Sequence, residues 1–156
     1  MTKLNEVKQF IQQNNIQAEI IERPGRSGIT SESAAEVTGV KIQQIIKTLL
    51  FIGKKKNLAI VICQGNKRID TKKLSEISGV KKPRMARPEE LAEILGTVPG
   101  GTPPICLPEN IPVFVDKGVM QQEFVVGSAG SEFVGIKLSP SDIVKFTKAK
   151  IVDVGE

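Results

Sequence analysis

The chain has 156 residues, of which 40% are hydrophobic and 25% are charged, and its formal net charge is +5. These proportions are typical of a folded protein with one core, and no apolar stretch approaches the ~20 residues that a membrane-spanning helix needs. The sequence has no histidine, which excludes Ser-His-Asp and Cys-His catalysis and histidine-ligated zinc. Because the first fifteen residues are too polar for a signal peptide, we expect a cytoplasmic protein.

The first forty residues predict two helices and a short strand. Thr2 can cap a helix with an apolar face made of Leu4, Val7, Phe10 and Ile11. Residues 18–22 have the pattern of a strand, and the sequence RPGRSGITS that follows predicts a loop. Either Ser31 or Ser33 can then cap a second helix, which ends at Gly39.

Two β-type runs, residues 45–52 and 58–63, are joined by five residues rich in lysine and predict a hairpin. Lys47 lies inside the first run. Side chains alternate along a strand, so Lys47 shares a face with Leu49 and Phe51. The ammonium can reach water past these neighbours, or it can project into a lined cavity as a partly desolvated cation. The pattern alone leaves both interpretations open.

Two helices with clear boundaries are predicted after the hairpin. Asp70 can cap a helix over residues 71–78 that closes at Gly79. The next helix covers residues 88–95, begins with a proline and two glutamates, and stops at Gly96.

The last third of the chain predicts mainly strands. Strand-like stretches occupy residues 104–107, 112–115, 123–127 and 132–138. Ser139 can cap a short helix, and residues 150–154 end the chain as a strand. Strands and helices alternate irregularly and without repeats, so we expect a single α+β domain over residues 1–156.

Two glycine-rich stretches are candidates for close approach of a ligand. In GTVPGGTPP, which begins at Gly96, the amides of Gly100 and Gly101 can form a concavity for an anion or a developing oxyanion. The alternative is a tight turn between a helix and a strand. No Gly-Lys-Ser/Thr follows, so the stretch is not a nucleotide-binding P-loop. Residues 127–130, GSAG, predict a hairpin turn when taken alone.

Positive charge is concentrated in the middle of the chain. The candidate phosphate contacts there are Lys54, Lys55, Lys56, Lys81, Lys82 and Arg84. The chain has no Trp or Tyr, so stacked bases are a weak basis for nucleic-acid binding. Cys63 and Cys106 each stand in an apolar run, which predicts two buried thiols and no disulfide.

The motifs IIKTLLF, RMARPEELAEILGTVPGGTPP, VFVDKGV and VVGSAGSEFVGIKLSP, in this order, resemble the YbaK family. Its members are free-standing aminoacyl-tRNA deacylases related to the editing insertion of bacterial prolyl-tRNA synthetases. The resemblance covers the chain from about Ile29 to the C-terminus. It implies a closed, mixed, barrel-like β-sheet surrounded by helices, and hydrolysis of mischarged tRNA in trans without a metal or an organic cofactor.

The resemblance also implies roles for individual residues. Lys47 would be the essential lysine, and Gly100 and Gly101 would hold the aminoacyl carbonyl through their backbone. The substrate pocket would further include Ile29, Thr30, Thr48, Gly127, Ser128 and Gly130. The basic residues named above would contact tRNA phosphates.

Three questions stay open at this point. Some members specific for alanyl-tRNA carry a histidine where this chain reads GSAGS, so Ala, Cys, Ser or Thr can be the amino acid removed. Lys47 can act as a fixed cation or, if neutral, as a base. The competing functions are a non-catalytic module that binds tRNA or a synthetase, and a domain that binds a small molecule in the same pocket.

Overall fold

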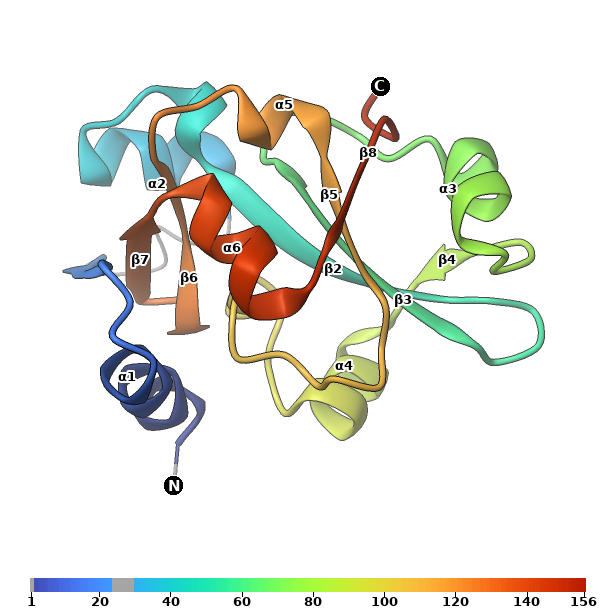
Figure 1. Ribbon diagram of the computed structural model, residues 1–156, viewed down its shortest axis with the longest axis horizontal. Coiled ribbons are helices and arrows are strands. Elements are labelled where there is room, and N and C mark those ends of the chain that lie inside the picture. Colours follow the sequence, from blue (N-terminus) through green and yellow to red (C-terminus); the bar gives the residue numbers. More distant parts are fainter. Residues whose placement is uncertain (1, 24–29) are drawn as a thin grey trace.

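The computed structural model describes residues 2–23 and 30–156. The chain alternates short helices and strands around two β-sheets (Figure 1). The helices are α1 (Lys3–Gln13), α2 (Ser31–Thr38), the 3-10 helix η1 (Ile42–Gln44), α3 (Thr71–Ser78), α4 (Pro88–Leu95), α5 (Lys117–Met120) and α6 (Pro140–Thr147). The strands are β1 (Glu19–Glu22), β2 (Ile46–Ile52), β3 (Leu58–Gln64), β4 (Arg84–Met85), β5 (Val113–Asp116), β6 (Val125–Ser131), β7 (Val134–Leu138) and β8 (Lys150–Val152). Within the described ranges, no helix is both long enough and apolar enough to span a bilayer.

The two sheets are open, and the predicted barrel-like closure is therefore wrong. The larger sheet has the order β4-β2-β3-β5-β8, and the smaller has the order β1-β7-β6. Only one bridge between Ile45 and Val126 joins their neighbouring edges in the described chain. The larger sheet is mixed, because β2 pairs antiparallel with β3 and β4 whereas β3-β5 and β5-β8 are parallel. The α+β class itself is confirmed.

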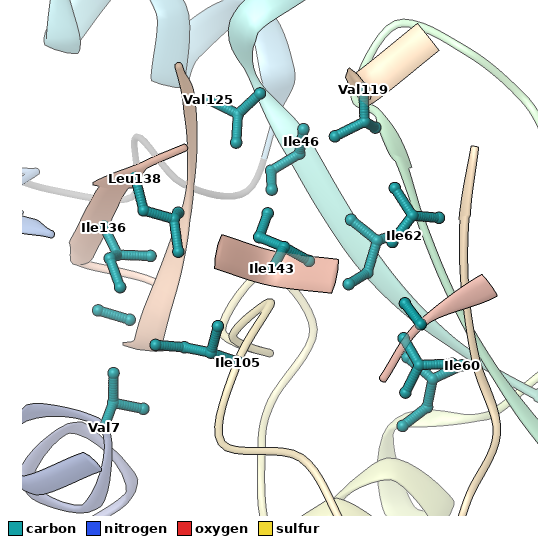
Figure 2. Packing of buried hydrophobic residues seen from close by; sticks show 14 of the residues in the cluster. Val7, Ile46, Ile60, Ile62, Ile105, Val119, Val125, Ile136, Leu138 and Ile143 are labelled. Carbon is teal, nitrogen blue, oxygen red and sulfur yellow. The ribbon is translucent and has the colours of Figure 1, made fainter. Parts of the chain in front are cut away.

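The main core lies where α6 packs between the two sheets. Figure 2 shows Ile143 of α6 among side chains from both sheets, including Ile46 and Ile62 of the larger and Ile136 of the smaller. Ile62, Ile136 and Ile143 are completely buried. At roughly 25 cal/mol per Å² of buried apolar surface, such residues supply the main force that holds the two sheets together.

Local signals place most helix ends where the sequence predicts them. The Thr2 hydroxyl accepts from the backbone N–H of Asn5, and the Asp70 carboxylate accepts from two amides in the first turn of α3. Gly79 and Gly96 end α3 and α4 in the left-handed conformation. The prediction for α2 is wrong in one detail, because the helix already includes Ser31 as its first residue.

Two predicted strand features are also wrong. Residues 104–107 form no strand, and residues 104–106 are bends, since Pro104 has no N–H to pair and Cys106 has a φ of 60°. Residues 127–130 are not a turn but part of β6, where Gly127 pairs with Ile136. The chain reverses later, at residues 132–133.

Candidate active site

A cavity of about 280 Å³ opens between the two sheets, bordered by α2 and the loop after α4. Five of the predicted site residues line it, namely Thr30, Lys47, Thr48, Gly100 and Ser128. They come from parts of the chain up to about a hundred residues apart, and the fold brings them together. Ile29 lies outside the described residues.

Lys47 lies near the start of β2, the second strand of the larger sheet. It is half-buried and shares a face with Leu49 and Phe51, as the alternation predicts. No carboxylate in the described chain lies within ion-pair distance of its ammonium. Lys47 therefore brings a positive charge without a paired carboxylate to a cavity with both polar and apolar walls, and an anionic group there would be stabilised.

The loop after α4 makes a tight turn at the cavity. The N–H of Gly101 donates to the carbonyl of Val98 at 2.8 Å, with Pro99 and Gly100 between them. Gly100 has a φ of +80°, so the turn has proline and glycine at the positions that a type II turn favours. The hydroxyls of Thr97 and Thr102, 2.8 Å apart and buried, tie the two ends of the loop together.

The two glycines of this turn differ in hydrogen bonding and in their position relative to the cavity. The amide of Gly101 is occupied by Val98, and Gly101 does not line the cavity. Gly100 does line it, and its N–H has no hydrogen-bond partner among the described residues. Of the two amides that the sequence suggested for an oxyanion, that of Gly101 is bonded within the turn, and that of Gly100 has no partner among the described residues.

Ser128 is the one member of the GSAG stretch that lines the cavity. Its hydroxyl donates a short hydrogen bond to the carbonyl of Gly100, which ties β6 to the turn. Gly127 instead packs against Ile46, because a Cβ there would lie 3.2 Å from that side chain. Gly130 lies against α1, where a Cβ would come within 2.9 Å of the Leu4 backbone nitrogen. Neither glycine lines the cavity.

Arg23 is a cavity residue that sequence reasoning missed. It follows β1, is only 3% exposed and lines the cavity. Its Nη2 donates to the Ser128 hydroxyl at 3.0 Å and to the carbonyls of Val134 and Ser131. Burial lowers the pKa of its guanidinium from the ordinary value. The only signal in the sequence is an arginine directly after a short strand, which did not distinguish it from a loop residue.

The model of the aminoacyl-tRNA editing domain matches residues 26–146, most of the chain. The chain belongs to the aminoacyl-tRNA editing domain family. The editing domain is 30% identical over 126 residues to an Enterococcus faecalis protein provisionally named Cys-tRNA(Pro)/Cys-tRNA(Cys) deacylase EbsC, covering 81% of this chain and 77% of that protein.

Two further similar proteins have names that refer to prolyl-tRNA synthetase. The editing domain is 32% identical over 113 residues to the proline–tRNA ligase of Stenotrophomonas maltophilia, which corresponds to 69% of this chain but 20% of the ligase. A crystal structure described as a candidate trans-editing enzyme for prolyl tRNA synthetase superposes with a TM-score of 0.89 at 25% identity. That superposition covers 100% of this chain and 98% of the other.

Neither cysteine of the editing domain is placed as a nucleophile. Cys63 is completely buried, and this burial raises the pKa of its thiol to about 12, although the charge of Lys47 acts in the opposite direction. Burial also raises the pKa of Cys106. Both thiols therefore stay protonated near neutral pH. No group of three or more Cys, Asp or Glu side chains in the described ranges is arranged to bind a metal.

The predicted basic residues of the editing domain form one exposed surface beyond the cavity. Lys54, Lys55 and Lys56 lie at the tip of the β2–β3 hairpin, which extends to the right edge of Figure 1. The N–H of Lys54 donates to the carbonyl of Lys81 at 2.8 Å, which brings the exposed Lys81–Lys82 pair beside the tip. We call these five lysines the hairpin-tip patch.

Arg84 differs from the lysines of the hairpin-tip patch. Its guanidinium makes two hydrogen bonds to the Glu90 carboxylate, at 2.8 and 3.0 Å. These bonds, together with one from the backbone N–H of Arg87, lower the pKa of Glu90 to about 2. The positive charge of Arg84 is thus offset by a neighbour in this structure.

Proposed function

We propose that this protein is a trans-editing deacylase that hydrolyses the ester between an incorrect amino acid and its tRNA. One observation carries the proposal: Lys47 and Gly100, whose amide has no hydrogen-bond partner among the described residues, line one small cavity in a member of the editing-domain family. An ester carbonyl bound between them would have a cation and a fixed N–H donor beside its oxygen. That is the arrangement that stabilises the negative charge formed when an ester is attacked.

The reaction uses water as the nucleophile. The water oxygen bonds to the acyl carbon and loses a proton while the carbonyl oxygen becomes an oxyanion. The bond to the ribose oxygen then breaks, and the ribose oxygen takes up that proton. The products are the free amino acid and a tRNA whose 3′-terminal hydroxyl is restored. Lys47 and the Gly100 amide lower the barrier by stabilising the oxyanion, and the reaction requires no histidine, thiolate or metal.

The amino acid removed is small in this proposal. The deacylase name of the Enterococcus faecalis relative makes cysteine the first candidate, and Ala, Ser and Thr are the alternatives. The cavity has a volume of about 280 Å³ and both polar and apolar walls, including Thr48 and Leu50, so it can accept an apolar, hydroxyl or thiol side chain.

The tRNA would bind through its phosphates to the hairpin-tip patch. Three lysines of this patch, Lys54, Lys55 and Lys56, project from the hairpin whose first strand carries Lys47. Lysine contacts to phosphate release counterions, so the affinity would fall steeply with salt concentration. Arg84 would contribute less than the lysines, because it is already bound to Glu90.

The test is a deacylation panel of tRNAs charged with Cys, Ala, Ser and Thr, using wild type, Lys47→Met and a control. Lys150→Met is the matched control, since Lys150 is an exposed lysine in β8. We expect wild type and the control to hydrolyse at least one substrate, and Lys47→Met to be slower by roughly 100-fold or more. If wild type binds tRNA but hydrolyses none of the four, the non-catalytic binding module is the correct function.

A further inference from the structure

Arg23 carries a buried positive charge that has no role in the proposed function. Arg23 is only 3% exposed, and a buried guanidinium is costly unless a carboxylate or several acceptors compensate it. No carboxylate in the described chain pairs with Arg23, and the acceptors it has are all met by one nitrogen, Nη2. The Nε atom is buried without any partner. A charge kept under these conditions indicates a role other than stability.

The contact with Ser128 links Arg23 to the reaction site. A serine hydroxyl has one proton to donate and two lone pairs to accept with. Because Arg23 donates to the Ser128 oxygen at 3.0 Å, the hydroxyl proton is left for another acceptor, which is the carbonyl of Gly100. Ser128 therefore connects Arg23 to Gly100 through two hydrogen bonds, and we call this connection the relay. Because its proton is already donated to Gly100, the hydroxyl is unsuited to be a nucleophile.

The relay ends on a peptide group that is held at both ends. The Gly100 carbonyl accepts from Ser128, and the Gly101 N–H of the same peptide donates to Val98. The preceding peptide, between Pro99 and Gly100, is the central peptide of the same turn, and the φ of +80° at Gly100 corresponds to its type II orientation. That preceding peptide carries the Gly100 N–H, the donor assigned above to the oxyanion.

We propose that Arg23 is a positioning residue that sets the direction of the Gly100 N–H through Ser128. The proposal rests on the proposed function of this cavity, because the direction of that N–H affects the rate only if an oxyanion forms there. The alternative is a structural role, since Nη2 also donates to the carbonyls of Ser131 and Val134 on either side of the β6–β7 turn. The two roles predict different kinetics.

The first measurement is a double-mutant cycle with single-turnover kinetics. Arg23→Lys and Ser128→Ala are each expected to lower the rate constant of hydrolysis roughly 10- to 100-fold with little change in KM, because transition-state positioning is lost. The double variant should be no slower than the slower single variant, because both changes break one relay. Multiplied losses, or an unchanged rate constant in Arg23→Lys, would overturn the proposal.

Chemical rescue provides a second readout that a structural role would not produce. Arg23→Ala is expected to be slow and to recover part of its rate in millimolar guanidinium, whereas Ser128→Ala should not recover. Equal recovery of both variants, or of neither, would contradict the relay. If Arg23→Ala does not fold, as judged by thermal unfolding, the cycle with Arg23→Lys decides the question.

The third measurement does not depend on hydrolysis. In amide NMR spectra, Arg23→Lys and Ser128→Ala should shift the Gly100 and Gly101 resonances in the same direction, while Gly79 stays unchanged as an internal control. If wild type hydrolyses no substrate, the proposed function fails, and these shifts still test the link between Arg23 and the turn. Unmoved Gly100 and Gly101 resonances would overturn that link.

Discussion

Lys47 and Cys63 are direct partners across strands β2 and β3. The thiol is completely buried beside the ammonium, yet its pKa is raised to about 12 because desolvation outweighs the attraction of Lys47 for a thiolate. The cysteine next to the proposed catalytic lysine is thus protonated and unreactive near neutral pH.

The first prediction concerns this thiol. We expect Cys63 in the folded protein to react more slowly with iodoacetamide at pH 8 than the partly exposed Cys106, as measured by peptide mass spectrometry. Cys63→Ala should keep hydrolysis within about threefold of wild type, because no thiolate takes part. A loss of activity as large as that of Lys47→Met would contradict this. The folded protein holds the Cys63 proton more tightly than the unfolded chain does. This contribution to the free energy of unfolding is therefore present below the ordinary pKa of 9.0 and is lost as the pH rises from 9 to 12.

The second prediction concerns tRNA binding. Replacing Lys54, Lys55 and Lys56 by glutamine should weaken binding and make the slope of log K against log salt shallower by about 2 to 3. The control changes the same amount of charge elsewhere, at the exposed Lys145, Lys148 and Lys150. Fluorescence titration at several salt concentrations provides both slopes. Equal slopes for the two triple variants would show that the hairpin tip does not contact phosphates.

The third prediction concerns the Arg84–Glu90 ion pair. The lowered pKa of Glu90 means that the pair stabilises the fold above the ordinary value of 4.5, and that this contribution is lost as the pH falls towards about 2. Arg84→Gln should return the pKa of Glu90 towards 4.5, because the hydrogen bond from the Arg84 side chain is the largest cause of the lowered pKa. Carboxyl NMR titration of Glu90 measures this directly. A midpoint that stays near 2 in the variant would assign the shift to Arg87 instead.

The fourth prediction concerns Gly130. Gly130 and Gly79 both have positive φ, but only at Gly130 would a Cβ collide with backbone, that of Lys3 and Leu4 in α1. Gly79→Ala should therefore cost about 1 kcal/mol of unfolding free energy from strain alone, and Gly130→Ala about 1 to 3 kcal/mol more. Urea denaturation measures both. Equal losses would mean that α1 moves aside without cost.

Features with local causes were predictable from the sequence. Helix α3 is an example, because its cap Asp70 and its stop Gly79 lie within ten residues and act on their own backbone. Lys47 was singled out for a similar reason, since a lysine within an apolar strand is unusual by itself. The position of Gly100 in a tight turn followed from the neighbouring proline and glycine.

Features with distant causes were not predictable. Residues 127–130 have the composition of a turn, but contacts from Ile46 and from α1, both far away in the sequence, require small residues there within a strand. The same applies to Arg23, whose hydrogen-bonded partner Ser128 lies 105 residues later. Whether the sheets close also depends on which distant strands pair with one another, and no single segment of the sequence determines that pairing.

The Gly100 amide has a consequence for how such a site can be found by mutation. The donor belongs to the main chain, so every residue except proline would supply the same N–H, and a loss in Gly100→Ala would report the strain of a positive φ instead of the donor. A side-chain scan would instead identify the residues that hold the turn, among them Ser128 and Thr102. Replacing the Pro99–Gly100 amide by an ester through chemical synthesis removes that single hydrogen and leaves all side chains in place.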